Sequence, residues 1–249
     1  MELALAPGFA EAFMLAFARV GAMVMLMPGL GERAIPMRQR LVIALALTLM
    51  ALPLLREAGG GGTPAPMRFV SEIITGLVLG LAGRLTMAVL DVAGTLIAQS
   101  VGLSFAQVMD PANGQQGEAI TSFLRIFGVC LIFATDLHHL AITGIFASYE
   151  VVAPGQGLAA GDMATLVLQL VTRLFEAGVL IAAPFVAFSF IFNLGLGLAA
   201  RLTPQLQLFY LSMPAAILLG LMAFSASLGA IGRTFLDVMR AALALPFGG

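Results

Sequence analysis

Three side chains that can bind a metal ion or carry a proton stand close together in the chain, at Asp136, His138 and His139. Asp136 and His139 are three positions apart, so on a helix they share one face and could ligate a metal or relay protons. A four-ligand zinc site needs more donors, and Cys130 does not stand at the spacing of a zinc motif. We therefore favour a helical turn whose polar groups bond to neighbouring helices, and we expect no metal.

The other candidate catalytic motifs lack the flanking residues that their function requires. The glycine-rich stretches at 76–83 and 195–197 lack the preceding strand and the following Lys-Ser/Thr of a phosphate-binding loop. Close packing of helices through small residues explains them better. The serines Ser100, Ser104 and Ser189 lack the flanking glycines of a nucleophile elbow. We expect no enzymatic activity and no cofactor.

The composition of the 249 residues excludes most soluble classes. Hydrophobic residues make up 60% of the chain and charged residues 10%, whereas soluble domains have about 45–50% and about 25%. So few charges cannot cover so much apolar side chain in water. The net charge of −1 also excludes a basic nucleic-acid binder. The sequence therefore predicts a polytopic membrane protein with membrane lipid among its partners and no nucleic acid.

Long apolar segments predict the elements that must position these residues. A membrane span needs roughly 20 mostly apolar residues, and turn residues separate the candidates. Pro53, Pro184 and Pro214 lie inside three of them and should kink the helices. We expect an all-α polytopic membrane protein of about six long, kinked hydrophobic helices in a single domain, 1–249. The expected helices cover about 12–30, 41–55, 69–105, 120–149, 165–200 and 206–239.

Ionisable residues interrupt these apolar segments. Each costs roughly 2.5–3.5 kcal/mol at mid-membrane unless it pairs or faces a wet cavity. Arg84 and Asp91 can pair on one helical face, as can Arg173 and Glu176. The pattern indicates a large assembly or a conduit. The interrupting residues are Arg19, Glu72, Arg84, Asp91, Arg125, Asp136, Arg173 and Glu176.

The segment from Phe105 to Glu118 joins two apolar helices near the middle of the chain. Asp110-Pro111 starts a turn, and Asn113-Gly114 tolerates positive φ, so the backbone should fold back tightly here. A plain surface loop and a re-entrant or pore-blocking loop both fit these residues, and physics alone leaves the two open.

Several motifs together resemble the FliR family, the flagellar branch of the FliR/SctT type III export-gate proteins. Each is weak alone, but their order and spacing along nearly the whole chain are specific. The motifs are Phe17-Ala18-Arg19, Met27-Pro28-Gly29-Leu30-Gly31, Ile35-Pro36, Gln99-Ser100-Val101-Gly102-Leu103 leading to Asp110-Pro111, Asp136-Leu137-His138-His139-Leu140, Pro154-Gly155, Ala183-Pro184, Asn193-Leu194-Gly195, Arg201-Leu202-Thr203-Pro204-Gln205 and Pro214.

The resemblance implies a non-enzymatic core subunit of the flagellar type III protein export gate. Such a chain sits in the bacterial inner membrane at the flagellar basal body, with its helical hairpins packed into a hetero-oligomer. FliP-like and FliQ-like gate subunits and FlhB-like and FlhA-like export proteins are the implied partners. In the family the mid-chain loop plugs the closed pore. Here that loop maps onto Phe105, Met109, Asp110, Pro111, Ala112, Asn113, Gly114, Gln115, Gln116 and Gly117.

A further set of residues is expected to act in structure or assembly and to carry no chemistry. Arg201 precedes Thr203-Pro204, where a helix must end or kink, and a cation is favourable at a helix C-terminus. We expect Arg201 and Asn193 to hold helix ends or subunit contacts. The full set is Arg19, Pro28, Arg84, Asp91, Asp136, His138, His139, Pro184, Asn193, Arg201 and Pro204.

The alternative from a different class is a secondary transporter or channel for a small solute. A secondary transporter is built from paired structural halves around a site at the membrane midplane. The sequence shows no such internal repeat.

Overall fold

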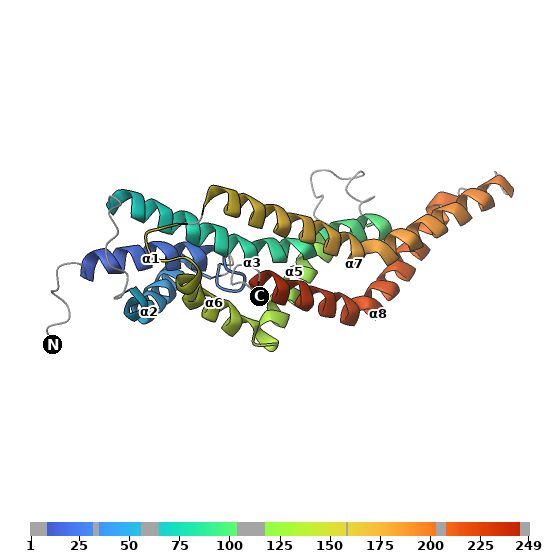
Figure 1. Cartoon of the computed structure of the whole chain (residues 1–249). Helices are drawn as coiled ribbons and strands as arrows, with labels where there is room; N and C mark the ends of the chain where they lie inside the picture. Colours follow the sequence, from blue (N-terminus) through green and yellow to red (C-terminus); the bar gives the residue numbers. More distant parts are fainter. Residues whose placement is uncertain are drawn as a thin grey trace. The chain divides into compact units, whose positions relative to one another are not determined.

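Helices are the only regular elements in the described part of the chain (Figure 1). The computed structural model describes residues 9–31, 35–55, 65–103, 118–157, 159–202 and 208–244. The seven helices within these ranges are α1 (Phe9–Leu26), α2 (Met37–Leu55), α3 (Ala65–Val101), α5 (Glu118–Ala134), α6 (Leu137–Val151), α7 (Ala160–Leu202) and α8 (Leu208–Ala244).

The predicted all-α class is confirmed, and five of the six predicted segments each correspond to one helix. The prediction of one helix over about 120–149 is wrong, because the chain breaks between α5 and α6 and bends there by 74°. Asp136 stands at the break with φ 57° and ψ 17°, in the left-handed region. That conformation costs an L-residue roughly 1–2 kcal/mol, and Asp is among the residues that tolerate it.

Within the described ranges, four helices are long and apolar enough to cross a membrane: Phe9–Leu26, Pro66–Val101, Gly161–Leu202 and Ser212–Leu243. The bent pair α5–α6 makes a fifth if it is counted as one span. Only 17% of the apolar window of α7 is buried within the chain. The exposed remainder of α7 therefore needs lipid or other chains around it, as expected for a polytopic membrane protein.

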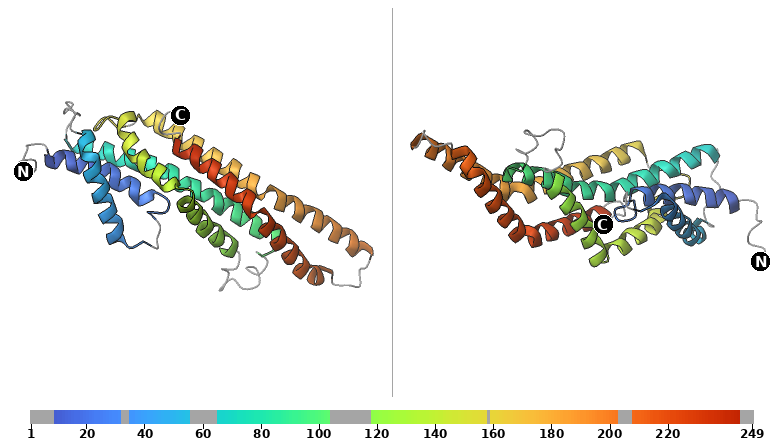
Figure 2. Two further views of the ribbon diagram at one scale, coloured as in Figure 1. Left: turned by 90° about the horizontal axis from the view of Figure 1, so that it is seen from below. Right: turned by 180° about the vertical axis from the view of Figure 1, so that it is seen from behind.

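The described residues form two compact units, each with its own packing. The first comprises residues within 1–86, 132–172 and 239–249. In it α1 and α2 pack against each other, and in the left view of Figure 2 α2 returns toward the start of α1. The buried core joins α1, α2 and α6 with one leucine of α3, through Leu15, Ala16, Val20, Met23, Val24, Met27, Ala44, Leu47, Ala51, Leu79, Ala141, Ile145 and Tyr149.

Glycines on α3 let that helix approach α1 closely within the first unit. Gly76, Gly80 and Gly83 recur at helical spacing along one face. A Cβ atom at Gly76 would collide with the carbonyl oxygen of Arg19, and one at Gly83 would lie 2.7 Å from Cδ of Pro28. The expected helix packing through small residues is confirmed for this stretch. Gly195 and Gly197 differ, since a Cβ there would meet no described atom within 4 Å.

The second unit comprises residues within 87–131 and 173–238. Here α3 and α5 approach at Gly94, where a Cβ atom would lie 2.8 Å from Cα of Thr121. Aromatic side chains link the other helices. The ring of Phe224 on α8 lies edge-on to the ring of Phe123 on α5, and the two centroids are 5.8 Å apart. The centroid of the Phe224 ring also lies 6.3 Å from that of Phe185 on α7.

The predicted intrahelical prolines are confirmed in their positions. Pro53 lies inside α2, Pro184 inside α7 and Pro214 inside α8. Each removes one backbone N–H donor, which leaves a carbonyl of the preceding turn without its helical partner. Such helices are tolerated at membrane depth where protein or a water-filled path satisfies the freed carbonyl.

Candidate functional site

A fully buried ion pair joins α1 to α3 in the first unit. The side chains of Arg19 and Glu72 are both 0% exposed. Arg19 Nε donates to Oε2 of Glu72 at 2.5 Å, and Nη2 donates to Oε1 at 3.0 Å. This two-point arrangement fixes the guanidinium plane against the carboxylate, which a single contact would not do.

Backbone groups provide further hydrogen bonds to the Arg19 guanidinium and to the Glu72 carboxylate. Arg19 Nη1 donates to the carbonyl oxygens of Ser148 at 3.0 Å and Val152 at 2.9 Å, at the end of α6. The backbone N–H of Gly155 donates to Oε1 of Glu72 at 2.6 Å. The guanidinium also lies 4.3 Å from the centroid of the Tyr149 ring. We call these groups the Arg19 clamp, because they tie α1, α3, α6 and the following turn together.

The turn that follows α6 depends on glycine. Gly155 has φ 81°, in the left-handed region where L side chains are rare. A Cβ there would lie 2.8 Å from Cδ of Arg68. The backbone N–H of Gly155 also donates to Glu72. Gly155 therefore combines the positive φ with the buried hydrogen bond. The predicted Pro154-Gly155 turn therefore completes the Arg19 clamp.

The Arg19 clamp suits a structural role. Two ions removed from water cost several kcal/mol each, and full hydrogen bonding is what makes such a pair tolerable. Every charged atom of Glu72 and every nitrogen of Arg19 has at least one partner in the described residues. The structural assignment of Arg19 stays a prediction, and its geometry agrees with that assignment.

A second ion pair lies in the other unit and corrects an expectation. Asp91 pairs with Arg125 of α5, where their side chains are 35% and 57% exposed. The suggested pairing of Asp91 with Arg84 is wrong, because Asp91 pairs instead with Arg125 of the neighbouring helix, and Arg84 is exposed. Arg173 and Glu176 are likewise exposed on α7 and form no ion pair with each other in the described chain.

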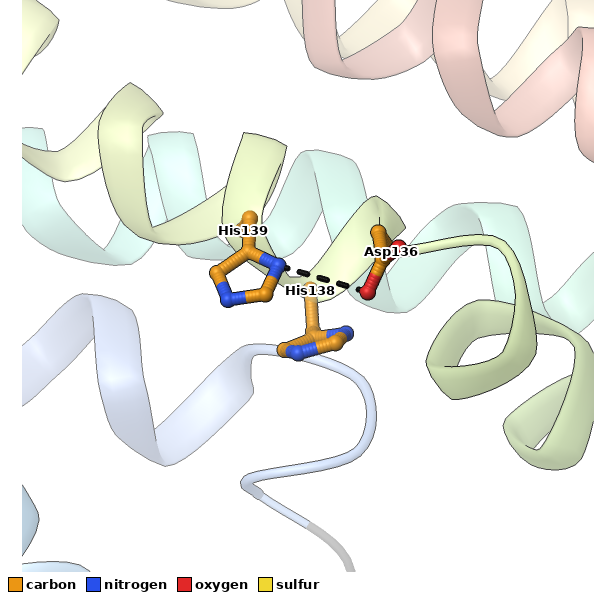
Figure 3. Close-up of side chains that lie close together, drawn as sticks. All are labelled: Asp136, His138 and His139. Carbon is orange, nitrogen blue, oxygen red and sulfur yellow. Dashed lines mark ion pairs between the residues drawn. The ribbon is translucent and has the colours of Figure 1, made fainter.

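The helix break brings Asp136, His138 and His139 together (Figure 3). His139 Nδ1 lies 3.5 Å from Oδ1 of Asp136, and both side chains are exposed. The ring centroid of His138 lies 5.1 Å from that of Phe133 and 4.1 Å from that of His139. One ligand atom from each of the three residues lies within 4.8 Å of the others. Nδ1 of His138 is buried and has no hydrogen-bond partner among the described residues.

The other described residues of the predicted structural set stand in the turn after α1 and on α7. Pro28 is buried in the turn after α1, and Pro184 is exposed on α7. Arg201 is exposed in the last turn of α7, which ends at Leu202 as predicted. Asn193 does not hold a helix end, because it lies inside α7 and its Nδ2 donates to the carbonyl oxygen of Ser189 at 2.8 Å. That Asn193 contacts another subunit stays a prediction.

The predicted plug loop lies outside the described residues. This applies to every one of its positions, Phe105, Met109, Asp110, Pro111, Ala112, Asn113, Gly114, Gln115, Gln116 and Gly117. Pro204, from the structural set, also lies outside them.

Sequence reasoning missed the partners of two charged residues. Glu72 and Arg125 were recognised only as interruptions of apolar segments, although each completes an ion pair. A charged residue within an apolar segment already indicates a partner of opposite charge, because a buried charge needs one. Sequence separation hid it, because Arg19 and Glu72 are 53 positions apart and Arg125 and Asp91 are 34 apart.

Comparison with known proteins gives one consistent result. Residues 10–242 match the model of the family described as bacterial export proteins, family 1. The flagellar biosynthetic protein FliR of Caulobacter vibrioides is 40% identical over 93% of this chain and 96% of its own length. The FliR proteins of Bacillus subtilis and Escherichia coli are each 28% identical, covering 83% and 84% of this chain and 82% and 80% of their own lengths.

Proposed function

The chain belongs to the bacterial export proteins, family 1, and on that premise we propose that it is a non-enzymatic core subunit of the flagellar export gate. The family membership already makes it a membrane component of flagellar protein export. The finer proposal is that it helps to form the pore for unfolded flagellar proteins in the inner membrane at the basal body. Residues 1–249 act as one export-gate domain in this proposal.

The 40% identity to a FliR protein along nearly the whole of both chains carries this proposal. The exposed apolar surface of α7 supports it, because a chain that works inside an assembly must present such surface to partners or lipid. Large apolar side chains that are exposed on this helix include Leu180, Phe190, Ile191, Leu194 and Leu198.

FliP-like and FliQ-like subunits are the proposed partners within the gate, and FlhB-like and FlhA-like proteins are its further contacts. No cofactor is part of the proposal, because movement of the exported chain would be driven by other components. The loop from Phe105 to Gly117 is the proposed plug of the resting pore. Its turn residues support that role, since Asp110-Pro111 and Asn113-Gly114 favour a compact fold-back.

Co-purification tests the proposal directly. The chain is expressed with FliP-like and FliQ-like subunits of the same bacterium, one of which carries the affinity tag, and the complex is extracted in mild detergent. We expect this chain in stable complex with both. The matched control replaces it with an unrelated polytopic membrane protein expressed at the same level.

Two outcomes would contradict the proposal. One is a failure of this chain to co-purify above the control. The other is solute-dependent transport by vesicles that contain this chain alone, which would favour the secondary transporter. A stable, monodisperse monomer without partners would also count against an obligate assembly.

A further inference from the structure

The side chains at the break between α5 and α6 have the composition of a small metal site. Asp136 supplies a carboxylate, and His138 and His139 supply imidazoles. Imidazole nitrogen suits zinc and similar transition metals, whereas calcium and magnesium prefer oxygen ligands throughout. We propose that these three residues bind one transition-metal ion of the Zn²⁺ class.

One pair of ligand atoms already has a suitable separation. Zinc bonds to nitrogen and carboxylate oxygen measure about 2.0–2.2 Å, so two ligands at the tetrahedral angle lie about 3.4 Å apart. The 3.5 Å between His139 Nδ1 and Asp136 Oδ1 matches this value. The other separations do not exceed 4.8 Å, and rotation of exposed side chains can close that difference.

His138 adds an independent reason to place a ligand here. A buried ring nitrogen without a hydrogen-bond partner is unfavourable, and Nδ1 of His138 is such an atom in the described chain. Coordination of a metal would satisfy a neutral imidazole at this position. The rings of His138 and His139 lie side by side with centroids 4.1 Å apart, so both can turn toward one ion.

Three protein ligands are sufficient for an open metal site. Sites of this kind hold three side chains and leave the fourth tetrahedral position to water or to another group. A fourth protein ligand is needed only in a closed site, so three side chains can hold zinc in an open one. Asp136 and His139 are 77% and 69% exposed at their side chains, which gives an ion a path to the site.

The local backbone explains how residues so close in sequence can converge. Asp136 takes the left-handed conformation at the break, and His138 and His139 stand in the first turn of α6. Figure 3 shows the three side chains on one side of this turn, beside the ribbon that follows α1. That segment touches the break through Gly29, where a Cβ would lie 3.1 Å from the Phe133 ring. A bound ion would hold Asp136 and the first turn of α6 in this arrangement.

The chain offers an unusually clean test, because His138 and His139 are its only histidines. The full-length chain is purified with the subunits that it needs for solubility, using an affinity tag that contains no histidine. Zn²⁺ content is measured after dialysis against buffered metal, and Co²⁺ is used as a visible probe of tetrahedral coordination. The wild-type complex is compared with the double variant His138→Gln/His139→Gln.

We expect the wild-type complex to hold one more Zn²⁺ per copy of this chain than the double variant, and only the wild type to show the Co²⁺ bands. Asp136→Asn should weaken Zn²⁺ binding by at least about tenfold. Cys130→Ser and Glu150→Gln are matched controls, since both side chains are exposed and neither belongs to the site. These two variants should bind as the wild type does.

Equal metal content in the wild type and the double variant would overturn the proposal. Loss of metal together with loss of the complex would be ambiguous for the double variant, so the single variant His139→Gln is measured as well. Its side chain is exposed, and the complex should therefore assemble. An assembled His139→Gln complex with wild-type affinity for Zn²⁺ would also contradict the site, whatever the outcome for export.

Discussion

Arg19 and Glu72 lie 53 positions apart in the sequence and meet in a two-point ion pair from which solvent is excluded. The pair connects α1 to α3, and the backbone of α6 and of the turn after it completes the hydrogen bonding. The first unit is therefore held together by polar groups at a point where its surroundings are apolar.

Removing one member of this pair should destabilise the first unit strongly. Arg19→Gln or Glu72→Gln should each lower the free energy of unfolding by about 3–5 kcal/mol, because the other charge stays buried without its partner. The measurement is the denaturation midpoint of the purified complex. Arg38→Gln, exposed on α2 of the same unit, is the control and should change little.

A double variant separates pairing from packing at this position. Arg19→Met/Glu72→Met removes both charges together, and it should recover part of the stability lost in either single variant. Single variants that both stay within about 1 kcal/mol of the wild type would show that the Arg19 clamp does not hold the unit.

Gly76 should not tolerate even a methyl group. Gly76→Ala would push a Cβ into the carbonyl oxygen of Arg19, and we expect a loss of about 1–3 kcal/mol from overpacking. Gly195→Ala is the matched change on α7, where no described atom lies near. It should leave stability unchanged or raise it by about 0.5–1 kcal/mol. Thermal melting of both variants checks this, and equal melting temperatures would contradict it.

Arg201→Ala should reduce assembly of the gate. Arg201 lies in the last turn of α7, where a cation interacts favourably with the free carbonyls and the helix dipole. The amount of chain that co-purifies with FliP-like and FliQ-like subunits measures the effect. Arg173→Ala, another exposed arginine of α7, is the control. Normal assembly combined with blocked export would assign Arg201 a different role.

Replacing residues 108–117 with a short flexible linker should make the assembled gate leaky to small ions. A hydrophobic constriction excludes water, and Phe105 and Met109 are the apolar residues proposed to form the seal with neighbouring chains. Export itself should persist, because the path is retained. Ion permeability of cells with and without the replacement is the measurement. Unchanged permeability in a gate confirmed to be assembled would locate the seal in a partner subunit.

The helices were predictable because apolar runs and turn residues depend on local chemistry alone. The end of α7 after Arg201 and the close packing at Gly76 followed from the same signals. The break at Asp136 was missed, because no proline or glycine stands at the break and the left-handed conformation of Asp136 depends on tertiary context.

Long-range pairing limited what could be predicted about the site. Arg84 was paired with Asp91 on the basis of helical spacing, whereas Arg125 of another helix takes that position. Local spacing identifies possible partners on one helix, but the nearest opposite charge in a folded bundle often lies on a neighbouring helix. The cluster at Asp136, His138 and His139 was identified correctly as a group, because its members are adjacent in sequence.

The Arg19 clamp also sets an order of events during biosynthesis. Arg19 emerges from the ribosome 133 positions before Val152, one of its carbonyl partners. At a synthesis rate of about 5–20 residues per second, this delay lasts roughly 7–27 s. For that time α1 carries a cation whose final set of acceptors has not yet been translated, so the first unit cannot close from its N-terminus onward. The first described helix therefore reaches its final environment only after α6 and the turn that follows it have been made.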